Sequence, residues 1–245
     1  MALPDIALYL AIAAIGSAVN SVAGGGTFLT FPVLILNGLT PLQANIASTI
    51  ALWPGSVASA VAFRSQRGHV ERERLVPFII ISVLGSAIGT AILLLAPERV
   101  FSFLVPWLLL MATLIFTFGR YLTPHAAGKH KAYALQFAIA IYGGYFGAGI
   151  GILMLAMLQV WGLTHIHQMN ALKTLLGSAI NGVAWVIFLF SGRVVWDVAA
   201  VMIVGAIVGG YAGARLSLRV DPGKIRALVS AVGFAMSAYF FLYGV

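Results

Sequence analysis

Long runs of apolar residues, separated by short polar stretches, follow one another along the whole chain. Most of these runs reach or approach the roughly 20 residues that a helix needs to cross a membrane. The apolar segments are 5–22, 27–37, 42–63, 75–96, 100–119, 132–146, 150–161, 166–190, 195–216 and 225–243. The segments 27–37, 132–146 and 150–161 are shorter than a span. The pattern predicts an all-α polytopic membrane protein.

Two of the apolar runs are interrupted by glycines, at 24–26 and within 143–151. A glycine in a helix interior costs about 1 kcal/mol relative to alanine. Backbone groups freed at membrane depth must also be satisfied by protein, water or a ligand. Each interruption is followed by a short apolar segment that starts near Thr27 or Ile150. We therefore expect two broken helical hairpins, each with a half-helix whose N-terminus points into the protein.

The composition supports a membrane protein and excludes several other classes. Of the 245 residues, 61% are hydrophobic and 8% are charged, whereas a soluble domain has about 25% charged residues. The net charge of +8 does not predict nucleic-acid binding, because Lys and Arg collect in loops, where they set membrane topology. The chain has no cysteine, which excludes disulfides, thiolate metal sites and cysteine nucleophiles.

The two halves of the chain match at an offset of about 125 residues. The matching pairs are Gly38-Leu39-Thr40 with Gly162-Leu163-Thr164, Asn45 with Asn170, Ser48 with Lys173, Thr49 with Thr174, and Gly26 with Gly151. Internal duplication is a common construction in transporters. We therefore predict an N-terminal repeat over 1–124 and a C-terminal repeat over 125–245, which together form one transporter domain.

The distribution of positive charge predicts that the two repeats are inverted. If each interrupted run is a re-entrant hairpin, one side of the membrane carries eleven Lys and Arg, in loops 64–74, 120–131 and 215–226. The other side then carries Arg99 and Arg193. If 5–37 crossed the membrane completely, the counts would be eight and five, which fits the positive-inside rule less well. We expect each repeat to be a Gly-broken re-entrant helical hairpin plus three transmembrane helices, with cytoplasmic basic loops and both termini outside.

The acidic residues offer no catalytic centre. All of them fall in loops or at span ends: Asp5, Glu71, Glu73, Glu98, Asp197 and Asp221. No carboxylate pair is therefore expected at depth for acid–base catalysis or proton transfer. The sequence has no HExxH motif and no metal-ligand cluster, and His165 and His167 face different sides of a helix. A membrane enzyme is disfavoured, and neither a cofactor nor a metal is expected.

The polar residues expected at membrane depth are neutral or positive. Lys173 lies about eight residues into its helix, or roughly 12 Å at 1.5 Å per residue. An intramembrane lysine without an acidic partner indicates a functional site, unless its stem snorkels to the interface. Asn20 and Asn181 add neutral donors.

The half-helix N-termini add unpaired N–H groups and partial positive charge. Together with Lys173 and the neutral donors, these features predict a small-anion site near the membrane midplane. The candidate residues are Gly24, Gly25, Gly26, Thr27, Asn45, Ser48, Thr49, Gly149, Gly151, Asn170, Lys173 and Thr174.

These motifs resemble those of the TauE/SafE family, or TSUP group, of sulfite and organosulfonate exporters. The resemblance rests on Gly24-Gly25-Gly26-Thr27-Phe28-Leu29-Thr30-Phe31-Pro32, Gly38-Leu39-Thr40-Pro41, Gln43-Ala44-Asn45, Gly147-Ala148-Gly149-Ile150-Gly151 and Met169-Asn170-Ala171-Leu172-Lys173. The family usually has a glycine triplet and a proline in the second copy, where this chain has Ala148, Ile150 and Met157. The resemblance covers essentially the whole chain. It implies export of small sulfur-containing anions such as sulfite or sulfoacetate, or uptake of related anions.

The expected function is therefore an anion exporter of the bacterial inner membrane that works by alternating access. A proton- or sodium-coupled importer of a similar anion remains an alternative, and so does a non-transporting membrane subunit. The expected partners are a small inorganic or organic sulfur-containing anion and the lipid bilayer, without nucleic acid. A homodimer is left open.

Overall fold

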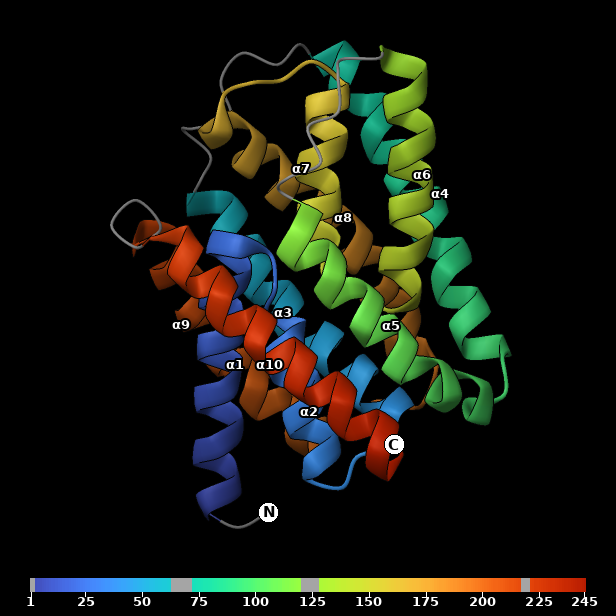
Figure 1. The fold of residues 1–245 in the computed structure, drawn as a ribbon, viewed down its shortest axis with the longest axis vertical. Coiled ribbons are helices and arrows are strands. Elements are labelled where there is room, and N and C mark those ends of the chain that lie inside the picture. The colour runs from blue at the N-terminus through green and yellow to red at the C-terminus, as the bar shows by residue number, and fades with distance from the viewer. Residues whose placement is uncertain (1–2, 63–71, 120–127, 217–220) are drawn as a thin grey trace.

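The computed structural model describes residues 3–62, 72–119, 128–216 and 221–245. Within these ranges the chain forms ten helices and no strand (Figure 1). The helices are α1 Leu3–Ala23, α2 Thr27–Leu36, α3 Pro41–Ala62, α4 Arg72–Leu95, α5 Glu98–Phe118, α6 Lys129–Tyr145, α7 Ile150–Val160, α8 Ile166–Phe190, α9 Trp196–Leu216 and α10 Pro222–Tyr243. Six of them are long and apolar enough to cross a membrane. The predicted all-α polytopic membrane fold is confirmed.

Both glycine-rich interruptions break the helix, and the half-helices begin where the sequence predicts. α1 ends at Ala23 and α2 starts at Thr27, while α6 ends at Tyr145 and α7 starts at Ile150. The turns use left-handed backbone at Gly24, Gly147 and Gly149, with φ values of +80°, +78° and +76°. Residues with a Cβ rarely adopt this conformation. The glycines therefore allow the chain to reverse direction inside the molecule.

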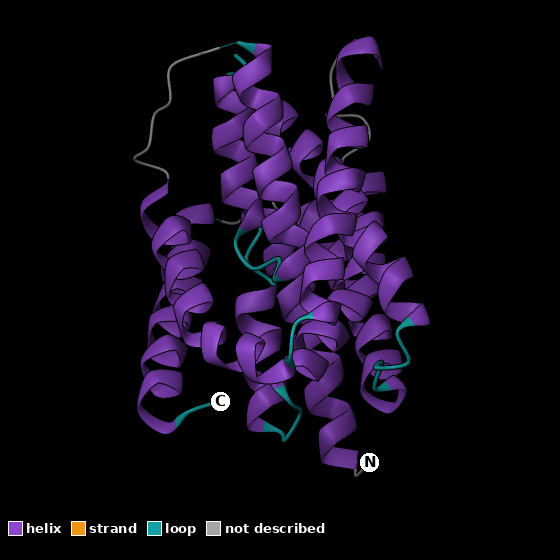
Figure 2. Cartoon of the chain, turned by 90° about the vertical axis from the view of Figure 1, so that its right-hand side faces the viewer, coloured by secondary structure: helices purple, strands orange, loops and turns teal. Residues whose placement is uncertain are grey.

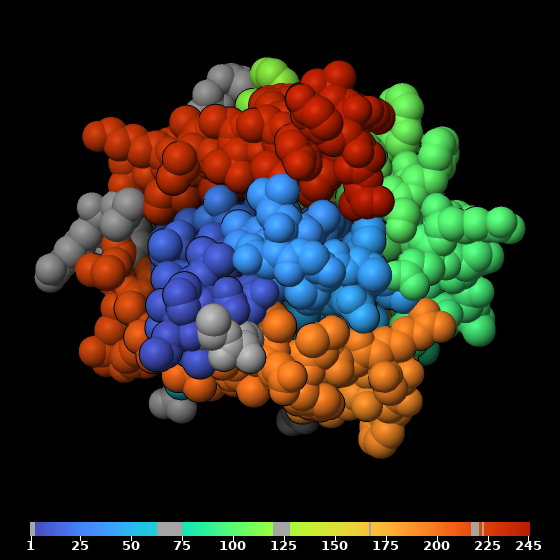
Figure 3. Space-filling model, turned by 90° about the horizontal axis from the view of Figure 1, so that it is seen from below, coloured from blue at the N-terminus to red at the C-terminus, as the bar shows by residue number. Residues whose placement is uncertain are grey.

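The two broken hairpins enter the molecule from opposite ends (Figure 1). α1 starts and α2 finishes at the end that carries both termini, whereas α6 starts and α7 finishes at the other end. Figure 2, turned by a quarter, also places the two termini at one end. Seen from that end, the segment that follows the first break fills the middle of the face (Figure 3). The first hairpin therefore covers the centre of this end of the molecule.

Two helices differ in length or polarity from what a re-entrant leg or a transmembrane span would show. α1 has 21 residues and span-like hydropathy, so it is roughly 31 Å long at 1.5 Å per residue, more than a half-depth leg requires. It packs along α9. α3, predicted as a span over 42–63, is absent from the set of apolar spans in the described part of the chain. Its polar residues lower its hydropathy, and four of them are buried: Asn45, Ser48, Ser56 and Ser59.

Small residues bring neighbouring helices into backbone contact, as is common in membrane proteins. A Cβ added at Gly209 of α9 would collide with the backbone of Ala14 in α1. A Cβ added at Gly89 of α4 would collide with the carbonyl of Ile141 in α6. Each hairpin therefore packs tightly on a long helix from the other half of the chain.

Replacing Gly209 by valine is expected to lower the thermal midpoint by roughly 2–12 °C, because overpacking typically costs about 1–3 kcal/mol. The matched control is Ala212→Val, at an exposed position of the same helix. Unfolding of both variants in one detergent, followed by intrinsic fluorescence, measures the difference. Equal midpoints would contradict the close α1–α9 contact.

The contacts between helices are reciprocal between the halves. α1 packs along α9 and α6 packs along α4, while α3 contacts α9 and α8 contacts α4. If α1–α5 and α6–α10 are the two copies, the first helix of each packs on the fourth helix of the other. An inverted duplication predicts this exchange. The division into 1–124 and 125–245 and the re-entrant character of the hairpins stay predictions.

The sidedness of the molecule also stays a prediction. Four of the eleven basic residues counted at one end lie outside the described residues: Arg64, Arg67, Arg120 and Arg219. Glu71 lies outside them as well.

Candidate functional site

The two glycine breaks meet inside the molecule. A Cβ built on Gly24 would lie 2.9 Å from Cα of Gly151, and a Cβ built on Gly151 would lie 2.9 Å from Cα of Gly24. Such a contact is shorter than real Cβ atoms show, so the two backbones touch at a point where only glycine fits. The half-helices α2 and α7 begin next to this crossing.

Neighbouring polar groups satisfy the backbone that the second break leaves unpaired. The side-chain amide of Asn45 on α3 donates to the carbonyl of Tyr145, the last residue of α6, at 3.2 Å. The hydroxyl of Tyr142 donates to the carbonyl of Ala148 at 2.8 Å. Buried backbone carbonyls need hydrogen-bond partners, and these two bonds supply them at the turn. No side chain caps the N-terminus of α7.

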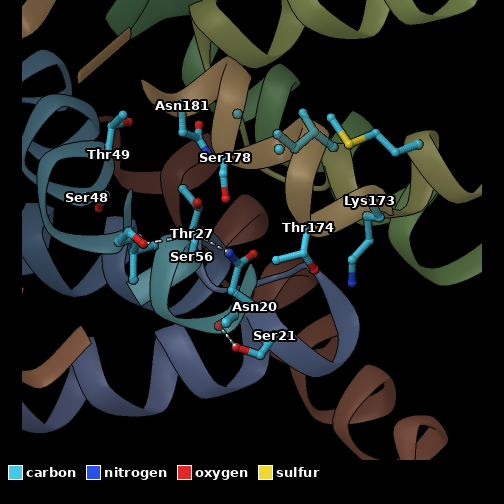
Figure 4. A pocket seen from close by; sticks show the side chains of 18 of the residues that line it. Asn20, Ser21, Thr27, Ser48, Thr49, Ser56, Lys173, Thr174, Ser178 and Asn181 are labelled. Atoms are coloured by element: carbon cyan, nitrogen blue, oxygen red, sulfur yellow. Dashed lines mark hydrogen bonds between the residues drawn. The ribbon is translucent and has the colours of Figure 1, made fainter. Parts of the chain in front are cut away.

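A polar cavity lies beside the crossing, between α1, α3, α7 and α8 (Figure 4). It is lined by Asn20, Ser21, Gly24, Thr27, Ser48, Thr49, Leu52, Ser56, Ser59, Phe146, Gly147, Ile150, Gly151, Met154, Lys173, Thr174, Gly177, Ser178 and Asn181. Its volume of about 40 Å³ compares with the roughly 10–15 Å³ that one water needs on this scale. The cavity therefore suits a solute of a few heavy atoms.

Lys173 supplies the positive charge of this cavity. The residue is 3% exposed, and its Nζ has no hydrogen-bond partner among the described residues. Its Cδ lies 3.4 Å from the position of a Cβ on Gly151, so the stem passes beside the glycine crossing. None of the described residues that line the cavity is acidic. Burying an ammonium group without a counter-ion costs free energy. A bound anion would offset this cost, so the site favours anion binding.

Seven of the twelve candidate residues predicted from sequence line this one cavity: Gly24, Thr27, Ser48, Thr49, Gly151, Lys173 and Thr174. They come from both halves of the chain, up to about 150 positions apart in sequence. The two hairpins and the central helices α3 and α8 therefore gather them at one place.

The other five candidates lie around the cavity without lining it. Gly25 packs against the ring of Phe116, and Gly26 packs against the backbone of Gly16. Gly149 forms the left-handed turn before α7. The side-chain amide of Asn45 donates to the carbonyl of Tyr145 at the end of α6. The backbone carbonyl of Asn170 accepts the hydroxyl of Thr174 at 2.9 Å, while its side-chain oxygen is buried without a partner in the described structure.

Comparison with known proteins identifies the family. The model of the sulfite exporter TauE/SafE family matches residues 8–240 of the chain. The chain belongs to the TauE/SafE family. The protein is thus a multi-pass membrane transporter of the TauE/SafE type, and this family points to an anion as its substrate.

Bacterial relatives of this TauE/SafE transporter carry similar descriptions. The chain is 28% identical over 244 residues to a probable membrane transporter protein of Haemophilus influenzae, covering 95% of this chain and 93% of the relative. It is 27% identical over 235 residues to the probable membrane transporter protein YfcA of Escherichia coli K12, covering 93% and 86%. It is 26% identical over 238 residues to the probable membrane transporter protein ORF9 of a Sinorhizobium species, covering 95% and 90%. No solved structure matches the chain significantly.

The TauE/SafE cavity also contains polar residues that were not assigned to the site from sequence. These are Asn20, Ser21, Ser56, Ser59, Ser178 and Asn181. Asn20 and Asn181 are expected at depth, but nothing in their spacing connects them to the glycine breaks. Ser48, Ser56 and Ser59 recur on α3 at intervals of eight and three residues, which places them near one face of a helix. That stripe was the signal available in the sequence.

Some of these hydroxyls already form hydrogen bonds with other groups of the protein. The hydroxyls of Ser21 and Ser59 lie 2.6 Å apart, and both reach the carbonyl of Gly210 on α9, at 3.1 Å and 2.9 Å. The amide of Asn20 donates to the hydroxyl of Ser56 at 3.2 Å, a bond drawn in Figure 4. These bonds join α1, α3 and α9 and form a fixed wall of the cavity.

Other polar atoms of the cavity have no partner within the described structure. Besides Nζ of Lys173, they are the hydroxyl oxygens of Ser48 and Ser178, both buried. Leaving a buried hydroxyl unpaired typically costs about 1–3 kcal/mol. Water or a bound solute that fills the cavity would recover this free energy.

Proposed function

We propose that this TauE/SafE transporter exports small sulfur-containing anions, such as sulfite or a sulfonate like sulfoacetate, through the cavity at the glycine crossing. The observation that carries the proposal is the buried ammonium group of Lys173, which has no hydrogen-bond partner and no acidic neighbour among the described residues that line the polar cavity. A sulfite or sulfonate group offers three oxygen acceptors for this donor, for the neighbouring hydroxyls and for the N-termini of α2 and α7.

The proposed mechanism is alternating access between the two halves, 1–124 and 125–245. Both halves contribute to the cavity, through α1 and α3 on one side and α7 and α8 on the other. The reciprocal packing of each hairpin on the other half supports a rocking motion in which the crossing stays near the centre. The anion would then be exposed first to one side of the membrane and afterwards to the other.

We propose a bacterial inner-membrane location with the basic loops in the cytoplasm and both termini outside. The basic loops, the apolar helices and the bacterial relatives support this orientation. In this orientation the anion leaves the cell along the membrane potential, because the cytoplasm is the negative side. Export then requires no coupling ion.

Anion efflux from proteoliposomes tests the proposed function. An inside-negative potential of 100 mV favours the exit of one negative charge by about 2.3 kcal/mol, or roughly a 50-fold ratio at equilibrium. We expect sulfite or sulfoacetate efflux to accelerate with this potential and to be insensitive to proton and sodium gradients. Liposomes without protein are the control. Flux that follows a pH or sodium gradient would instead indicate a coupled importer, and absence of flux would contradict transport of these anions.

A further inference from the structure

The polar cavity has a charged end and a neutral end. In Figure 4, Lys173 and Thr174 lie at one side, Ser48 and Thr49 lie at the other, and Ser178 lies between them. At the predicted offset of 125 residues, Ser48 corresponds to Lys173 and Thr49 corresponds to Thr174. The two copies therefore place a hydroxyl and an ammonium group at related positions of one cavity.

Two tryptophans fix how α3 and α8 lie against each other along the cavity. The indole N–H of Trp53 on α3 donates to the carbonyl of Ser178 at 2.9 Å. The indole N–H of Trp185 on α8 donates to the carbonyl of Ile50 at 3.2 Å. The two indole rings also pack together, with their centroids 4.8 Å apart. The helices are thus antiparallel, with Ser178 beside Trp53 and Ile50 beside Trp185.

This register orders the unpartnered groups along the cavity as Lys173, Ser178 and Ser48. Ser178 follows Lys173 by five residues on α8, which is about 7.5 Å of helix rise. Ser48 precedes Trp53 by five residues on α3, which is a similar distance on the far side of Ser178. Ser48 is 1% exposed, and both hydroxyl oxygens are buried without a partner in the described ranges.

We propose that Ser178, with Ser48 beyond it, forms a neutral subsite that recognises an uncharged hydrogen-bonding group on the transported anion. The anionic group lies at Lys173, and the neutral group is carried a few bonds away on the same solute. The inference rests on the proposed anion site and adds a substrate class to it. That class is short organic monoanions with a hydroxyl or similar polar group opposite the charge. The chain that connects the two groups must be short, because the cavity is small.

The neutral subsite predicts discrimination within matched pairs of sulfonates. A buried hydroxyl that gains a hydrogen bond favours the solute that supplies it by about three- to tenfold. The probes are 2-hydroxyethanesulfonate and 3-hydroxypropanesulfonate, each compared with the alkanesulfonate that lacks the hydroxyl. Dissociation constants are measured by calorimetry on purified wild-type protein. We expect at least one hydroxylated probe to bind three- to tenfold more tightly than its parent.

Two serine variants test which residues cause this preference. Ser178→Ala is expected to bring the ratio of the two dissociation constants close to one. The carbonyl that Trp53 holds is unaffected by the change, so the helix register is kept. Ser48→Ala is expected to reduce the ratio as well. It tests the same subsite if the Ser178→Ala protein fails to fold. Ser237→Ala is the matched control, because Ser237 is a buried serine on α10 that donates to the carbonyl of Gly233.

Lys173→Met separates failure of the subsite from failure of the anion site. This change is expected to weaken both members of a pair equally and to keep their ratio. If wild type binds both sulfonates without preference, or if neither serine variant changes the ratio, the subsite is overturned and the anion site stands. If wild type binds sulfite but neither sulfonate of a pair, the substrate class proposed here fails and the anion site stands. If it binds none of these anions, the proposed function fails as well.

Discussion

Replacing Lys173 by methionine is expected to weaken binding of a sulfur oxyanion by roughly 10- to 100-fold, because a hydrogen bond to a charged group contributes about 1.5–3 kcal/mol. Transport of the anion should fall in parallel. Methionine has a similar length and removes the charge and the three donors. Titration of purified protein with sulfite or sulfoacetate, followed by flux in proteoliposomes, measures both effects.

The stability of the same variant distinguishes a binding role from a structural one. Lys173 is buried and its Nζ is unpartnered in the described structure, so its charge destabilises the ligand-free fold. We therefore expect Lys173→Met to have an equal or higher thermal midpoint without ligand. The control is Lys224→Met, which removes a charge from an exposed position and should leave binding unchanged. A Lys173→Met protein that binds normally would remove this lysine from the site.

Replacing Gly24 by alanine is expected to damage both the fold and transport. The residue has a φ of +80°, and an added Cβ would lie 2.9 Å from Cα of Gly151. An L-residue in the left-handed region costs roughly 1–2 kcal/mol. The contact with Gly151 adds to this, because backbone cannot rotate out of the way. We expect a loss of thermal midpoint of roughly 6–12 °C and little remaining flux.

Gly38→Ala is the matched control for the glycine crossing. Gly38 has a φ of +88°, and nothing lies within 4 Å of an added Cβ. It therefore reports the backbone strain alone, and its midpoint should fall by only a few degrees. Similar losses in the two variants would show that the Gly24–Gly151 contact does not matter.

The sequence was sufficient to predict the breaks and much of the cavity. Consecutive glycines inside an apolar run have few structural uses, so the half-helix starts at Thr27 and Ile150 were placed correctly. The polar residues at helical spacing after each break followed from the duplicated motif, and Ser48, Thr49, Lys173 and Thr174 do line the cavity. Polar side chains in an apolar helix must face protein rather than lipid, which makes this part of the site predictable.

The remaining details depend on contacts between distant segments. Whether a glycine faces the cavity or a neighbouring helix depends on tertiary packing, and Gly25 meets Phe116 rather than the cavity. The amide of Asn45 donates to the carbonyl of Tyr145, which is available only because α6 ends there, beside α3. The partner helix of α1, which is α9, lies about 190 positions later in the chain. None of these partners is visible in the local sequence pattern.

The central claim is that an anion binds beside Lys173 at the crossing of the two broken hairpins. The most direct test is an experimental structure of the protein with selenite, an analogue of sulfite whose selenium gives an anomalous signal. We predict a selenium peak in the cavity, within hydrogen-bonding distance of Nζ of Lys173 and next to Gly151. Selenium peaks confined to exposed Arg and Lys residues, with the cavity holding only water, would contradict the account.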